Sequence, residues 1–225
     1  MGNVLRPVVH KRNYLPICVV ICIFFIQACE KAAVEENFRF IAIGNVPQEK
    51  MTEISETLAE HRARIVENFG VTDLRTITVK IWQDRRAFEL AYGEDAEHTQ
   101  GYVDIDNWEV RFFNGRPSLG LSTVHEFTHL VTVALNPSIA NNPRWLWEAT
   151  AIYESNRPPV PSPTSLGCIS PSTFPTLEEL EKHPSNIYRI GYFLIEYIIA
   201  NWGQEDLNKL IQSNGNIQES LGVTK

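Results

Sequence analysis

The chain has 225 residues, of which 44% are hydrophobic and 10% aromatic, enough for one domain with a proper buried core. Residues 1–28 hold three of the 20 Lys and Arg and none of the 27 Asp and Glu, so residues 29–225 carry a formal net charge of −10. A chain this acidic repels phosphate, which excludes nucleic acid as an expected partner.

The first 28 residues have the pattern of a secretory signal peptide. Three basic residues, Arg6, Lys11 and Arg12, precede an almost uninterrupted apolar run at 17–26. That run is shorter than the roughly 20 apolar residues that a membrane-spanning helix needs. We therefore expect a processed leader and an exported protein.

The leader ends in Ile-Gln-Ala-Cys at 26–29, which resembles the bacterial lipobox, where the cysteine is lipidated and becomes the mature N-terminus. We expect a lipid on Cys29 to hold the protein on a membrane of the cell envelope, with polar residues 29–37 as a tether. Cys168 then has no disulfide partner in the mature chain. Because it lies in a stretch rich in Pro and Ser, it is interpreted as an incidental thiol rather than a nucleophile.

The residues after the tether alternate between β-prone runs and helical patterns. A strand is expected at 38–43. After Pro47 a helix is expected whose apolar residues run from Met51 to Phe69 and which ends at Gly70, followed by a strand at 76–82 and a helix at 85–92.

Two further β-prone segments, at 101–104 and 108–113, are separated by three residues and predict a hairpin. One of its strands could form a sheet edge to which an extended peptide adds by main-chain hydrogen bonds. An ordinary antiparallel edge without a ligand explains the pattern equally well.

A helix expected at 119–135, ended by Asn136-Pro137, carries the motif His125-Glu-Phe-Thr-His129. Residues four apart lie on one helix face, so His125 and His129 could bind a single cation with Glu126 beside them. A solvated helix that happens to carry these side chains is the alternative. The apolar residues around the motif indicate a buried helix, where two imidazoles and a carboxylate need a common partner.

Glu148 is the best candidate for a third ligand, since a catalytic zinc site has three protein ligands and one open position. Eighteen residues separate His129 from Glu148, enough for the first helix to end and a second to return beside it. The flanking Trp145 and Leu146 would pack this second helix. The alternative is a surface carboxylate on an amphipathic helix.

The arrangement His-Glu-x-x-His, eighteen residues, then Trp-Leu-Trp-Glu-x-x-Ala-x-Tyr resembles the gluzincin metallopeptidases, and in size the small peptidase MA-like bacterial proteins. The resemblance is most specific over residues 121–153. Ala149 stands where family members usually have Gly, and no upstream motif for a substrate's free amine is evident, which argues against aminopeptidase activity.

The resemblance implies a role for each motif residue. His125, His129 and Glu148 would bind one zinc ion, and Glu126 would act as general base and return the proton to the leaving amine. The expected substrate is a peptide or protein.

The tetrahedral intermediate also needs a stabilising group, usually a Tyr or His across the cleft. A helix expected at 187–200 opens with Tyr188, which is similar in place to a Tyr of peptidase MA-like proteins. Tyr192, one turn further along, and His183 are the alternatives. Each tyrosine could equally be a packing residue whose hydroxyl reaches solvent.

The predicted fold class is α+β. Residues 38–225 would form one zincin-like domain, with a small mixed or antiparallel sheet in the N-terminal half and a mainly helical C-terminal half. The active-site helix would lie between the two.

Two other functions remain open. One is an envelope lipoprotein with a zincin-like fold that binds metal or a partner without turnover, which an intact Glu126 disfavours because a structural zinc needs no base. The other is a zinc amidase that acts on a non-peptide amide, such as a cell-wall cross-link.

Overall fold

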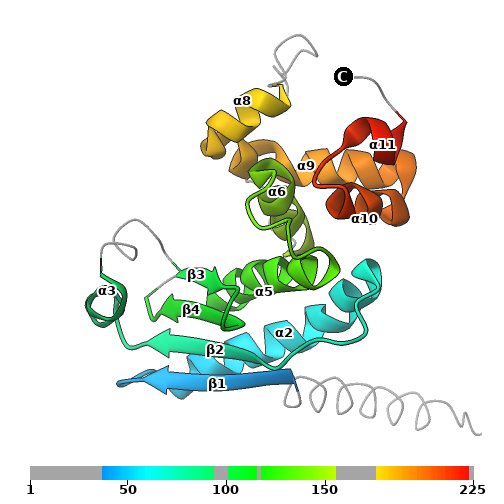
Figure 1. Cartoon of the computed structure of the whole chain (residues 1–225). Coiled ribbons are helices and arrows are strands. Elements are labelled where there is room, and N and C mark those ends of the chain that lie inside the picture. Colours follow the sequence, from blue (N-terminus) through cyan, green and yellow to red (C-terminus); the bar gives the residue numbers. More distant parts are fainter. Residues whose placement is uncertain (1–36, 94–100, 116–117, 156–175, 223–225) are drawn as a thin grey trace, which may run out of the picture.

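The computed structural model describes residues 37–93, 101–115, 118–155 and 176–222 (Figure 1). The expected leader, the lipid-bearing Cys29, nearly all of the tether and Cys168 lie outside these residues.

One mixed sheet lies in the N-terminal half of the described chain, in the order β1-β2-β4-β3. Its strands are β1 (Phe38–Ile43), β2 (Ile77–Trp82), β3 (Gly101–Asp104) and β4 (Glu109–Phe113). The strands β1, β2 and β4 are parallel, whereas β3 forms the predicted hairpin with β4 and is an edge strand. Trp108, expected in the second strand of the hairpin, lies in the turn with a positive φ of 53°.

Two long helices, α2 (Gln48–Phe69) and α5 (Leu119–Leu135), pack on one face of this sheet (Figure 1). The alternate residues Ile77, Val79 and Ile81 of β2 are fully buried in the core that they share with these helices. The helices approach closely at Gly120, where a Cβ atom would lie 2.2 Å from Thr57 Oγ1. The site-bearing helix α5 is therefore fixed against the sheet layer.

The short helix α3 (Arg85–Tyr92) makes a second, smaller aromatic cluster at one end of the sheet. Phe88 of α3 packs against Trp82 at the end of β2, with ring centroids 5.5 Å apart. The sequence predicts the bounds of α3 correctly.

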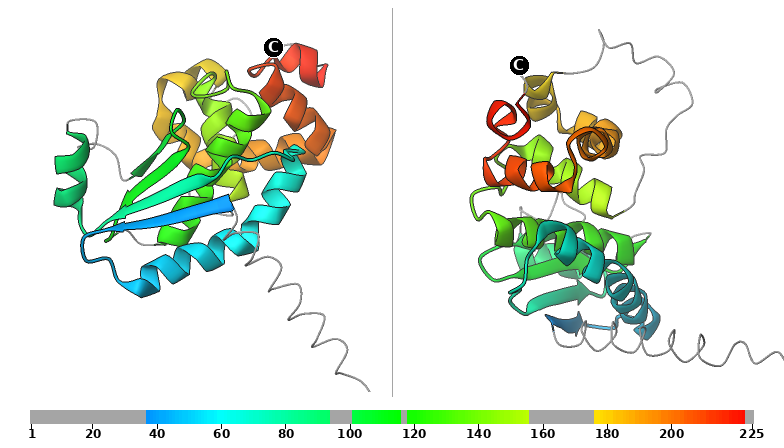
Figure 2. Two further views of the ribbon diagram at one scale, coloured as in Figure 1. Left: turned by 60° about the horizontal axis from the view of Figure 1, so that its bottom comes forward. Right: turned by 90° about the vertical axis from the view of Figure 1, so that its right-hand side faces the viewer.

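The C-terminal half is helical and lies on the other side of α5 from the strands (Figures 1 and 2). Its helices are α6 (Arg144–Glu154), α8 (Leu177–Lys182), α9 (Pro184–Trp202), α10 (Gln204–Gln212) and α11 (Ile217–Leu221). The helix α6 contacts both α5 and α9. The architecture is thus α+β as predicted, with α5 between the sheet and the helical half.

Among the helices that the structure describes, none is both long enough and apolar enough to cross a membrane.

Candidate metal centre

Helix α5 brings both motif histidines to its α6 side. The predicted bounds, 119–135, are those observed. His129 is buried with 2% of its surface exposed, and its ring centroid lies 4.7 Å from that of the half-buried His125. Glu126 follows His125 on the same helix and is half-buried. The solvated-helix alternative is therefore wrong, because most of α5 is buried.

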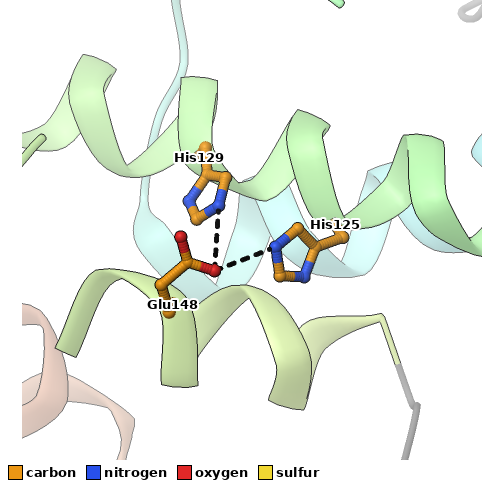
Figure 3. Close-up of side chains that lie close together, drawn as sticks. All are labelled: His125, His129 and Glu148. Carbon is orange, nitrogen blue, oxygen red and sulfur yellow. Dashed lines mark ion pairs between the residues drawn. The ribbon is translucent and has the colours of Figure 1, made fainter. Parts of the chain in front are cut away.

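Glu148 projects from α6 toward the two histidines (Figure 3). Its Oε2 atom lies 3.3 Å from His125 Nε2 and 3.9 Å from His129 Nε2. Glu148 is only 7% exposed, so it is not the surface carboxylate of the alternative interpretation.

The three side chains form a group that could hold a metal ion, because one donor atom from each lies within 4.8 Å of the others. Two ligand atoms of a tetrahedral zinc site, each about 2.0–2.1 Å from the ion, are separated by about 3.3 Å. The shorter of the two carboxylate distances matches that separation and the other is slightly wider. Two imidazoles and a carboxylate suit zinc and other divalent first-row metals.

Contacts at both ends of α6 hold Glu148 in place. At the C-terminal end, Glu154 is fully buried and pairs with Arg64 of α2. Arg64 Nη2 also donates to the Glu154 carbonyl (2.7 Å), and Asn68 Nδ2 donates to Glu154 Oε1 (3.1 Å). At the other end, Glu181 of α8 accepts from the first two backbone N–H groups of α6, at 2.9 and 3.0 Å.

The electrostatics favour the protonation states that bind a cation. Burial would raise the pKa of Glu148, but the hydrogen bond from His125 and the positive charge that each imidazole carries when protonated lower it to about 2. Burial, together with the neighbouring His125, lowers the pKa of His129 to about 3. At neutral pH Glu148 is therefore an anion and His129 a neutral imidazole, as metal coordination requires.

Of the three candidates for the stabilising group, Tyr188 is the one that contacts the donor group. Its hydroxyl donates to Glu148 Oε2 (3.0 Å), while the residue as a whole is about half exposed. Burial and the negative charge of Glu148 raise the pKa of Tyr188. Tyr192 instead packs on Tyr153, with ring centroids 5.3 Å apart, and His183 is exposed between α8 and α9.

Trp147 is a residue of the site that sequence reasoning missed. Its ring lies 3.8 Å from that of His129, centroid to centroid, with an angle of 33° between the planes. His129 Nδ1 is buried and has no hydrogen-bond partner among the described residues. Packing on Trp147, rather than the usual hydrogen bond to the second ring nitrogen, orients this imidazole.

Compared with known protein families and with curated proteins, the chain matches none. Its function is therefore inferred from the residues and the geometry of the candidate metal centre.

Proposed function

We propose that this protein is a zinc-dependent peptidase of the gluzincin type with a zincin-like fold. The observation that carries the proposal is the convergence of His125, His129 and Glu148 from two helices, with Glu126 adjacent on the first of them. A purely structural ion would have no use for a carboxylate in that position.

The ion would be held by the three converging side chains, and when bound it supplies a Lewis acid that polarises a carbonyl and acidifies water. Glu126 takes the proton from the water that attacks the scissile carbonyl. The same carboxylate then gives the proton to the leaving amine, so one residue serves both halves of the reaction.

Tyr188 could position Glu148 or stabilise the tetrahedral intermediate. In the structure its hydroxyl donates to Glu148 Oε2, which fixes the orientation of that carboxylate. To stabilise the oxygen of the tetrahedral intermediate, the hydroxyl would have to turn from Glu148 to the substrate.

The direct test compares the wild type with Glu126→Gln for zinc content and for hydrolysis of an unbiased peptide library. We expect stoichiometric zinc in both proteins and a loss of activity of about 10²- to 10⁴-fold in the variant. Well-folded wild type without stoichiometric zinc would refute the proposal. Zinc without hydrolysis of any peptide would favour the non-catalytic lipoprotein or an amidase acting on another amide bond.

Export and lipid attachment at Cys29 belong to the same proposal. They rest on the leader pattern and the Ile-Gln-Ala-Cys sequence at 26–29. Mass spectrometry of the mature N-terminus should find a lipidated Cys29, and an unmodified terminus elsewhere would reject the assignment.

A further inference from the structure

Arg144 is a cation beside the candidate metal centre that has no role in the reaction described above. It is the first residue of α6 and lies four residues before Glu148, so both side chains start from one face of the helix. The residue is partly buried, and its Nε atom is fully buried without a hydrogen-bond partner.

No carboxylate among the described residues forms an ion pair with the guanidinium of Arg144. Glu181 is used by the backbone N–H groups at the start of α6. The side chain of Arg144 instead donates a hydrogen bond to the hydroxyl oxygen of Tyr188. That hydroxyl donates its own proton to Glu148 Oε2 (3.0 Å). The Tyr188 hydroxyl therefore links Arg144 to Glu148, one of the three candidate metal ligands.

Two other partly buried arginines form ion pairs with carboxylates, and a third, Arg62, donates to the neutral amide oxygen of Asn37. Arg64 pairs with the buried Glu154, and Arg111 forms ion pairs with Asp104 and Glu109. At Arg144 a neutral hydroxyl stands where these two arginines have a carboxylate, so its partly desolvated charge is less fully compensated. The cost at Arg144 is explained if an external anion completes the pair.

We propose that Arg144 binds a carboxylate of the substrate, so that the preferred substrates carry a carboxylate close to the bond that is cleaved. The inference rests on the proposed peptidase function and deepens it. A planar guanidinium holds a carboxylate through two parallel hydrogen bonds, which gives direction as well as charge. In a peptide this group is either the C-terminal carboxylate or the side chain of an Asp or Glu.

The test uses mixed tetrapeptides in four matched sets. One set has free C-termini and no acidic residues, and the second is the same set with amidated C-termini. The third set is amidated and contains one Glu, and the fourth replaces that Glu by Gln. The first pair isolates the C-terminal carboxylate and the second pair isolates an acidic side chain.

We expect wild type to prefer the carboxylate member of one pair, with a kcat/KM about 10- to 100-fold higher, the size expected for a charge-assisted hydrogen-bond pair. Arg144→Gln should abolish this preference, because it lowers kcat/KM for the carboxylate-bearing member of that pair by more than for its neutral counterpart. Arg189→Gln is the matched control, because it removes an exposed positive charge of the neighbouring helix α9 and should keep the preference.

A binding measurement separates this inference from the proposed function. Calorimetry on zinc-loaded Glu126→Gln, with and without Arg144→Gln, follows the same four sets without turnover. If wild type hydrolyses no peptide, the peptidase proposal fails, while a carboxylate preference in binding that depends on Arg144 still supports the inference.

The role of Arg144 would be overturned if the two members of each pair had equal kcat/KM with the wild type and equal affinity for zinc-loaded Glu126→Gln. An equal loss across all four sets in Arg144→Gln would overturn it as well. If that variant does not fold, Arg144→Lys replaces it, and it should keep the charge but lose most of the preference.

Discussion

Replacing Tyr188 by Phe tests whether the hydroxyl positions Glu148 or acts on the substrate. The hydroxyl donates to Glu148 Oε2 at 3.0 Å, and a hydrogen bond to a charged acceptor is worth about 1.5–3 kcal/mol. Losing the outer hydrogen bond of a metal ligand lowers metal affinity by about 10- to 100-fold. We expect Tyr188→Phe to weaken zinc binding by that factor, with little change in folding because Tyr188 is 48% exposed.

Zinc affinity is measured by competition with a chromophoric chelator, and kcat is then measured at saturating zinc. The control is Tyr197→Phe, which removes the same atom from a tyrosine that is 59% exposed on the same helix. It should leave both quantities unchanged. Unaltered zinc affinity in Tyr188→Phe, together with a large fall in kcat at saturating zinc, would refute the positioning role and assign the hydroxyl to the intermediate.

Two further predictions concern stability. The folded pKa of His129 is lowered to about 3, so the unfolded chain binds the extra proton as the pH falls below about 6.5, and the metal-free protein should lose stability there. Urea unfolding at about pH 7 and about pH 5 should show this loss, and an equal pH dependence in His129→Gln would contradict it. Arg64→Ala leaves the fully buried Glu154 without its cation and should cost about 3 kcal/mol in urea unfolding. Arg39→Ala, which removes an exposed arginine, is the control. If Arg64→Ala lowers the free energy of unfolding by no more than Arg39→Ala does, the Arg64–Glu154 pair does not anchor α6.

The bounds of several elements could be predicted because local chemistry sets them. Helix α5 ends at Leu135 because Asn136 and Pro137 follow it, and α2 ends where Gly70 adopts a left-handed conformation with φ 63°. The first residue of a helix is harder to predict where the helix begins with polar residues. Helix α2 starts at Gln48, directly after Pro47 and three residues before the first apolar position of the pattern.

Some residues of the candidate site can likewise be predicted from local sequence, whereas others depend on tertiary contacts. The four-residue spacing of His125 and His129 places both on one helix face whatever the fold. Glu148 could be proposed only because zinc chemistry demands a third ligand. The contacts of Trp147 with His129 and of Arg144 with Tyr188 join separate elements or turns, and no periodicity in the sequence indicates them.

Contacts between protein residues hold Glu148 close to His125 and His129. Glu148 is held by α6, whose ends are fixed by the Arg64–Glu154 pair and by Glu181 of α8, and its Oε2 atom is fixed by Tyr188. Burying two imidazoles and a carboxylate together removes their hydration, and a bound cation would offset that cost. Because the fold supplies the positions beforehand, a bound ion would not have to order the chain. Such preorganised ligands are what the proposed catalytic centre would require, whereas a zinc that folds its own domain orders its ligands when it binds.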